Sequence, residues 1–75
     1  MYYTTDMTIE DLGYIIRERR NTLKMNQDSL SQRSSVAIKT IHSIEQGKAN
    51  PSLKTLNLLL KELKLELFIR TETSN

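Results

Sequence analysis

The sequence has 75 residues, of which 11 are Lys or Arg, nine are Asp or Glu and none is Cys, and its formal net charge is +2. A chain of this length forms one small domain near the lower size limit for independent stability, and without cysteine it gains no disulfide or Cys/His zinc cluster. Its start lacks the basic and apolar regions of a signal peptide, and its longest apolar run is far too short to span a membrane. We therefore expect a cytoplasmic protein with no membrane contact and no cofactor.

The basic residues are concentrated in the middle of the chain. Residues 17–54 contain eight Lys or Arg and three Asp or Glu, whereas the two ends together hold three basic and six acidic residues. The middle therefore carries a net charge of +5 and the ends −3. This asymmetry favours a polyanionic partner, nucleic acid first, although a solvated helical surface explains the same charges.

The first predicted helix begins after Thr8, which forms a capping-box pattern with Asp11 three residues later. Arg19 and Arg20 lie in or beside the predicted buried face, so one of them must find a partner or extend to solvent, and the spacing does not decide which. That face consists of apolar residues at helical spacing: Ile9, Leu12, Ile15, Ile16 and Leu23.

Two short helices follow, joined by a tight turn. The first begins near Asn26, has Leu30 facing the core, and ends at Ser34 and Ser35, whose side chains compete for backbone hydrogen bonds. Val36 is the apolar residue that fills the turn.

The second of these helices covers about residues 37–46. Ile41 and Ile44 face inward at 100° per residue, and Gly47 is the expected left-handed residue that ends the helix. Its outward positions are Lys39, His42, Ser43 and Gln46. Two short helices joined in this way describe a helix-turn-helix, in which the second helix enters the major groove of DNA.

A fourth helix is predicted over residues 53–63, with Ser52 as its N-cap. Its expected buried face is leucine at five positions: Leu53, Leu56, Leu59, Leu60 and Leu63. The apolar residues that follow (Leu65, Leu67 and Ile69) alternate with others, which predicts a strand. A lone strand needs a partner for its backbone groups, and the same strand of a second copy, antiparallel across a two-fold axis, supplies one. The alternative is that the fourth helix continues through Phe68.

The predicted organisation is a flexible N-terminus (residues 1–7), a helix-turn-helix domain (8–64), a dimerisation strand (65–70) and a disordered tail (71–75). The fold class is all-α, a helix-turn-helix bundle of four to five helices, with a C-terminal β-strand that pairs across a homodimer.

The segment NQDSLSQRSSVAIKTIHSIEQGKANPSLKTL resembles the helix-turn-helix of the Xre/Cro family of lambda-repressor-like phage proteins and their bacterial relatives. The flanking segments DLGYIIRERR and LKLELFIR resemble HipB-type antitoxins, which are small Xre-family repressors encoded beside HipA-type serine/threonine kinase toxins. The resemblance covers residues 9–70. It includes these positions at the family spacing: Gln27, Leu30, Val36, Ile41, Ile44, Glu45, Gly47, Asn50, Pro51, Leu53, Thr55 and Leu56.

The turn departs from the family pattern at four positions. Ser31, Ser34 and Ser35 stand where the family usually has a small apolar residue, an apolar residue and glycine, which predicts a wetter or looser turn. Ala37 stands at the N-cap of the recognition helix in place of Ser or Thr, at a local cost of about 1 kcal/mol.

The resemblance implies a structural ion pair between Arg20 and Glu45, and a base-reading or phosphate-binding role for Lys39. Ile38 either packs on a thymine methyl group or belongs to the edge of the core, and His42 and Lys48 are either phosphate neighbours or plain surface residues. The implied DNA-binding set is Asn26, Gln27, Ala37, Ile38, Lys39, Thr40, His42, Ser43 and Lys48. The predicted dimer interface consists of Leu65, Leu67 and Ile69.

No nucleophile–histidine–carboxylate set, glycine-rich phosphate loop or metal-ligand cluster is present in the sequence, so we do not expect an enzyme. We expect a homodimeric, sequence-specific repressor of double-stranded DNA whose operator is an inverted repeat. The resemblance implies that its partner is a HipA-like kinase toxin and that it regulates its own operon as the antitoxin. A stand-alone or phage-type regulator without a toxin is the alternative.

Overall fold

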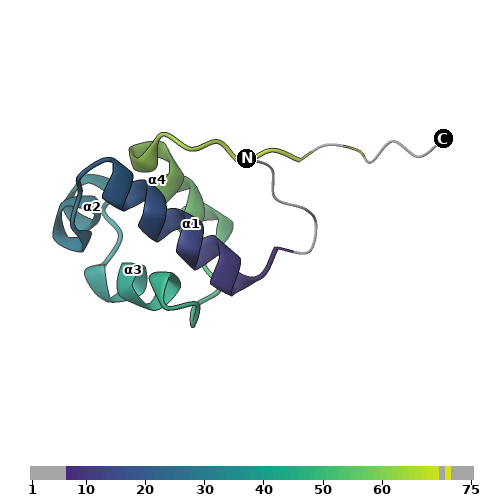
Figure 1. Ribbon diagram of the computed structural model, residues 1–75, viewed down its shortest axis with the longest axis horizontal. Helices are drawn as coiled ribbons and strands as arrows, with labels where there is room; N and C mark the ends of the chain where they lie inside the picture. The colour runs from purple at the N-terminus through teal and green to yellow at the C-terminus, as the bar shows by residue number, and fades with distance from the viewer. Residues whose placement is uncertain (1–6, 70, 72–75) are drawn as a thin grey trace.

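A computed structural model describes residues 7–69 and 71 of the chain. It contains four helices in this part: α1 (Ile9–Thr22), α2 (Gln27–Ser34), α3 (Ile38–Glu45) and α4 (Leu53–Leu63). Helix α1 packs against α3 and α4, and α2 packs against the same two helices. Figure 1 shows the resulting bundle, with α3 along one edge and the C-terminal segment leaving at the end of α4. The all-α helix-turn-helix bundle is thereby confirmed. Among the described helices, none has both the length and the apolar character needed to cross a membrane.

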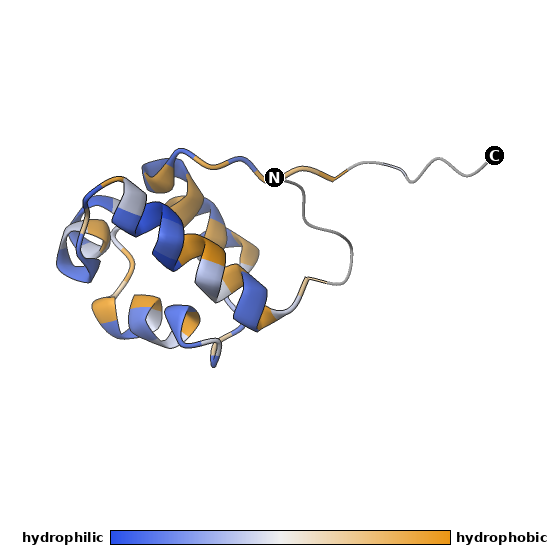
Figure 2. Ribbon diagram, in the orientation of Figure 1, coloured by the Kyte–Doolittle hydropathy of each residue, from blue (hydrophilic) through white to orange (hydrophobic). Residues whose placement is uncertain are grey.

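The core lies where the apolar faces of the four helices meet, as Figure 2 shows by hydropathy. Burying each of its large side chains contributes about 1.5–3 kcal/mol. The side chains that are fully shielded from solvent are Ile16, Leu30, Ile41, Ile44, Leu59 and Leu63, and Val36 joins them from the turn between α2 and α3. Both short helices therefore depend on the long ones, since eight residues alone form no stable helix.

Local capping defines where the helices begin. The Thr8 hydroxyl accepts a hydrogen bond from the Asp11 amide at 3.1 Å, and the Asp11 carboxylate accepts one from the Thr8 amide at 3.1 Å. The expected capping box is therefore confirmed. Ser52 caps α4 by accepting from the Thr55 amide at 3.1 Å, again as predicted.

A close backbone approach holds α1 against the end of α3. Gly13 is buried in α1, and a Cβ atom built on it meets the carbonyl oxygen of Ile44. Only glycine leaves room for this contact. After α3 ends, Gly47 has a φ of +73°, as its predicted left-handed role requires, and it lies against Glu10 of α1.

For α4, the predicted range is confirmed, one expectation about its buried face is wrong, and the alternative for its end does not hold. Leu53 is 62% exposed rather than buried, because it opens the helix beyond the core that Leu59 and Leu63 reach further along. The helix also does not continue through Phe68: it ends at Leu63, and Lys64 takes a left-handed conformation with a φ of 56°.

The segment after α4 forms no strand over residues 65–69 in the single chain. Leu65 packs against the core, whereas Leu67, Phe68 and Ile69 are exposed. Residue 70 of the predicted strand lies outside the described residues, as do residues 1–6 of the predicted flexible N-terminus and residues 72–75 of the predicted disordered tail.

Candidate nucleic-acid interface

The turn between α2 and α3 is held by serine hydroxyl groups. Ser34 is buried, and its Oγ donates to the Leu30 carbonyl at 2.6 Å and accepts from the Val36 amide at 3.2 Å. Ser31 Oγ donates to the Val36 carbonyl at 2.6 Å. These bonds pair both backbone groups of Val36, so the expectation of a wetter or looser turn is wrong at these two positions.

Ser35 takes the conformation that the family reserves for glycine. It is the residue after α2 and has a φ of 64° and a ψ of 18°, in the left-handed region. A residue with a side chain pays about 1–2 kcal/mol in this conformation. Because Ser35 is exposed, the turn still forms with serine at this position, but it bears that conformational cost.

Helix α3 presents a mixed outer surface. Ile41 and Ile44 are fully buried on its inner side, which leaves the opposite side of an eight-residue helix facing outward. Lys39 and His42 are exposed there, and Thr40 and Ser43 are partly exposed. The surface is therefore small, polar and basic, with hydroxyl groups that donate and accept hydrogen bonds.

The first turn of α3 is open. Ala37 is the N-cap, as predicted, and makes no side-chain cap hydrogen bond. Ile38 is 42% exposed, so it is not a buried core residue. An exposed isoleucine beside Lys39 is the arrangement in which an apolar contact with a thymine methyl group is available.

The N-terminus of α2 meets the end of α3. Asn26 caps α2 with its side-chain oxygen, which accepts from the Ser29 amide at 2.7 Å. Gln27 is partly exposed, and its Nε2 donates to Glu45 Oε1 at 3.1 Å. This bond uses one of the two N–H groups of the amide and orients the side chain at the junction of the two helices.

An ion pair fixes the same junction from inside. Arg20 Nε lies 2.8 Å from Glu45 Oε2, Arg20 Nη2 donates to Glu45 Oε1 at 2.8 Å, and Nη1 donates to the Met25 carbonyl at 2.8 Å. The side chains of Arg20 and Glu45 are 11% and 3% exposed, respectively. The hydrogen bonds to Glu45 raise the pKa of Arg20 above its usual value; burial opposes this rise and the Coulombic attraction of Glu45 adds to it.

This geometry answers the question of which arginine turns inward. Arg20 enters the bundle and forms the expected pair with Glu45, whereas Arg19 donates from Nε to the carbonyl of Leu63 at 2.8 Å and so satisfies the last turn of α4. Two neighbouring arginines of α1 thus hold two helices in place, Arg20 holding α3 and Arg19 holding α4.

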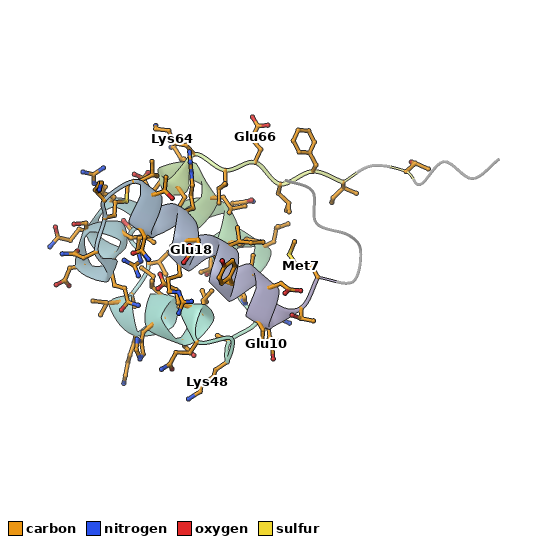
Figure 3. The ribbon with its side chains drawn as sticks, viewed as in Figure 1. Met7, Glu10, Glu18, Lys48, Lys64 and Glu66 are labelled. Carbon is orange, nitrogen blue, oxygen red and sulfur yellow. The ribbon has the colours of Figure 1, made fainter. Side chains whose placement is uncertain are left out.

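Lys48 lies in the loop after α3. It is exposed, and Figure 3 shows its side chain reaching outward on the edge of the molecule that α3 occupies. Its backbone amide donates to the Ser43 carbonyl at 3.0 Å, which ties the loop to the helix. Gln46 is exposed and continues the outer face of α3. The predicted DNA-binding set does not include it, although the helical period places it on that face.

A fold in which two short helices meet across a tight turn, the second with an exposed polar face, defines a helix-turn-helix domain. The family model for the helix-turn-helix, HTH_3, matches residues 16–69. The chain therefore belongs to this Xre-like helix-turn-helix family. A search of curated proteins by sequence found no match.

Solved structures with a similar fold include restriction-modification controller proteins. The controller C.AhdI from Aeromonas hydrophila is 26% identical, with a TM-score of 0.74 over 77% of this chain and 88% of that chain. Wild-type C.Esp1396I is 26% identical, with a TM-score of 0.72 over 77% and 76% of the two chains. The C.Esp1396I tetramer bound to its natural 35 base-pair operator gives the same identity, TM-score and coverage. The antitoxin part of the resemblance rests on the sequence alone.

Proposed function

We propose that this protein is a sequence-specific DNA-binding transcriptional repressor, in which α3 reads bases in the major groove. The observation that carries the proposal is the outer face of α3, where Lys39 and His42 are exposed while Ile41 and Ile44 anchor the helix in the core. In a helix-turn-helix, the first residues of the second helix meet base edges. Lys39 and Ile38 occupy that place, with Ala37 before them.

The other members of the proposed site surround these residues. Thr40 and Ser43 offer hydroxyl groups to phosphate or base edges, and Lys48 extends along the same edge. Gln27 and Asn26 stand at the N-terminus of α2, where backbone N–H groups favour a phosphate. The hydrogen bond from Gln27 to Glu45 fixes the side-chain amide of Gln27 at the start of α2. This fixed position supports a phosphate-binding role for Gln27.

The proposed active form is a homodimer on an inverted repeat. Two copies of α3 then enter major grooves whose centres are separated by one helical turn of DNA, about 34–36 Å, or by a multiple of that distance. The C-terminal segment supplies the dimer contact: Leu65, Leu67 and Ile69 alternate along it, and Leu67 and Ile69 are exposed in the single chain. A second copy of the segment covers them and pairs the backbone.

Two biological settings fit this activity. The resemblance of residues 9–70 to HipB-type antitoxins supports an antitoxin that binds a HipA-like serine/threonine kinase toxin and represses its own operon. The similarity to controllers such as C.AhdI supports a regulator of another kind of operon, without a toxin. The reading frame next to the gene separates them, since a kinase-like neighbour supports the antitoxin and its absence the stand-alone regulator.

The test is fluorescence anisotropy of labelled DNA from upstream of the gene, beside a scrambled duplex of equal length. We expect the upstream DNA to bind at least about 1,000-fold more tightly, with both affinities falling as salt rises from about 50 to 200 mM. Equal, weak binding of the two duplexes contradicts the proposal.

The Lys39→Ala variant tests whether Lys39 reads bases. Its loss is expected to cost about 1–3 kcal/mol of specific binding energy and to reduce the margin over the scrambled duplex. Lys61→Ala is the matched control, because it removes the same charge from an exposed position on α4, a helix that does not belong to the motif. An equal loss in both variants would point to general charge rather than base reading by Lys39.

A further inference from the structure

Hydrogen bonds join one side chain from each of three helices, from the interior of the domain to its surface. Arg20 of α1 donates from Nη2 to Glu45 Oε1 of α3 at 2.8 Å, and Gln27 of α2 donates from Nε2 to the same oxygen at 3.1 Å. Arg20 and Glu45 are buried, whereas Gln27 is partly exposed. The buried ion pair therefore extends, by one further hydrogen bond, to a side chain that is open to solvent.

We propose that Glu45, neutralised by Arg20, is a positioning residue for DNA binding: it orients the side-chain amide of Gln27 so that an N–H group remains available to a phosphate. This inference rests on the phosphate contact of Gln27 in the proposed function and adds how that contact is set. The ion pair then acts on DNA affinity through Gln27, in addition to stabilising the fold.

The acceptor chemistry of Glu45 determines which end of the Gln27 amide faces inward. A carboxylate offers only acceptors, whereas the amide has a donating NH2 group at one end and an accepting oxygen at the other. Next to Glu45 only the NH2 end forms a hydrogen bond, since the oxygen end would face a second acceptor. The NH2 group carries two N–H bonds, and no other described residue accepts from it. One donor is therefore left for a phosphate oxygen, which is also an acceptor.

Without Glu45 the amide loses this preference. The terminal torsion of a free glutamine is broad and roughly two-fold, so the NH2 group and the oxygen exchange places. The oxygen repels a phosphate, and the rotation must stop when DNA binds, which costs side-chain entropy. An orientation that is already fixed in the free protein avoids both penalties, as preorganisation does in binding generally.

Arg20 makes a carboxylate at this position compatible with a nearby phosphate. An unpaired carboxylate would repel the phosphate, but Arg20 Nε and Nη2 donate to the two oxygens of Glu45, each at 2.8 Å. The side chain of Glu45 is only 3% exposed. Its charge is therefore balanced inside the domain, and what the ion pair presents at the surface is the neutral, oriented amide of Gln27.

Side-chain 15N relaxation of the free wild-type protein tests this orientation without any substitution. Gln32 is the matched control, because it is an exposed glutamine on the same helix. We expect an order parameter of about 0.85 for the Gln27 amide, as in rigid backbone, and below about 0.6 for the Gln32 amide. Equal mobility of the two amides overturns the proposal.

A double-mutant cycle on DNA affinity tests whether the ion pair acts through Gln27. Arg20→Met with Glu45→Met replaces both charges by apolar side chains, a change that folded domains often tolerate, and circular dichroism checks the fold. In the wild-type background we expect Gln27→Ala to weaken binding of the upstream and the scrambled duplex alike, by about tenfold, because a phosphate contact carries no sequence information. In the background with both methionine substitutions we expect Gln27→Ala to weaken binding by less than about twofold.

An equal loss in the two backgrounds overturns the positioning role, because a purely structural ion pair leaves the contribution of Gln27 unchanged. A wild-type background in which Gln27→Ala has no effect overturns it as well. Gln32→Ala is the control and is expected to leave the affinity unchanged in both backgrounds. If the variant with both methionine substitutions does not fold, the order parameters of the wild type test the proposal by themselves.

The same titrations separate this inference from the proposed function. A wild type that binds the upstream and the scrambled duplex equally contradicts the sequence-specific repressor. The cycle measured on the scrambled duplex still tests the phosphate contact, since every duplex carries phosphates. A wild type that prefers the upstream duplex, together with an equal Gln27→Ala loss in both backgrounds, removes the positioning role alone.

Discussion

Replacing Glu45 with alanine removes the carboxylate that neutralises Arg20 inside the bundle. Two charge-assisted hydrogen bonds of 2.8 Å are lost, and so is the acceptor of the Gln27 amide. Because the Arg20 side chain is only 11% exposed, water does not replace the lost partner fully. The variant therefore keeps a buried, unpaired charge rather than only losing an attraction.

Breaking a well-buried pair by removing one partner costs about 3–5 kcal/mol. A domain of this size has a total stability of about 4–11 kcal/mol, at about 0.05–0.15 kcal/mol per residue. Glu45→Ala is therefore expected to remove a large part of this free energy of unfolding. Since each kcal/mol shifts Tm by about 4–8 °C in a small domain, we expect Tm to fall by at least about 12 °C.

The assay is thermal and urea unfolding followed by circular dichroism, with ΔG of unfolding taken from the urea curve. Glu18→Ala is the matched control, because Glu18 is an exposed carboxylate on α1 (Figure 3). In a double-mutant cycle, Arg20→Met with Glu45→Met is expected to cost less than the sum of the single changes. A Tm for Glu45→Ala equal to that of Glu18→Ala, or a cycle with no coupling, would refute the reasoning.

Other substitutions test local features by the same unfolding assay. Gly13→Ala gains about 1 kcal/mol of helix propensity but forces a Cβ against the Ile44 carbonyl, so we expect a net loss of about 1–3 kcal/mol; an unchanged urea midpoint contradicts the close approach. Ser35→Gly relieves a left-handed side chain and is expected to raise stability by about 0.5–1 kcal/mol, whereas a decrease shows that the conformation differs. Ala37→Ser supplies the missing cap of α3 and is expected to add about 1 kcal/mol, and no gain means that the serine does not reach the α3 amides.

The helices of this protein could be predicted closely because their signals are local. Thr8 with Asp11, and Ser52 with Thr55, are cap contacts within four residues of chain, so the starts of α1 and α4 follow from neighbouring side chains. Gly47 likewise ends α3 through its own backbone freedom. The helical period alone predicted that Lys39 and His42 face outward from α3.

The expectations that failed concern contacts between elements. Leu53 satisfies the apolar pattern of α4, but whether a helix position is buried depends on how far the neighbouring helices reach. The serines of the turn suggested water, yet Ser31 and Ser34 bond to backbone groups that only the folded turn brings to them. Gly13 carried no apolar signal, yet a Cβ atom there would meet the carbonyl of Ile44 at the end of α3.

The sequence by itself determined the four helices, the position of the turn and the outward face of α3, because capping and hydrophobic period act within a few residues. The hydrophobic period did not decide which arginine of α1 turns inward, since Arg19 and Arg20 both flank the apolar stripe; the family resemblance implied Arg20, and the tertiary structure shows the contacts that place both side chains. Arg20 reaches Glu45, 25 positions along the chain, while Arg19 meets the end of α4 at Leu63. That choice depends on three helices being in place at once, and no local pattern contains it.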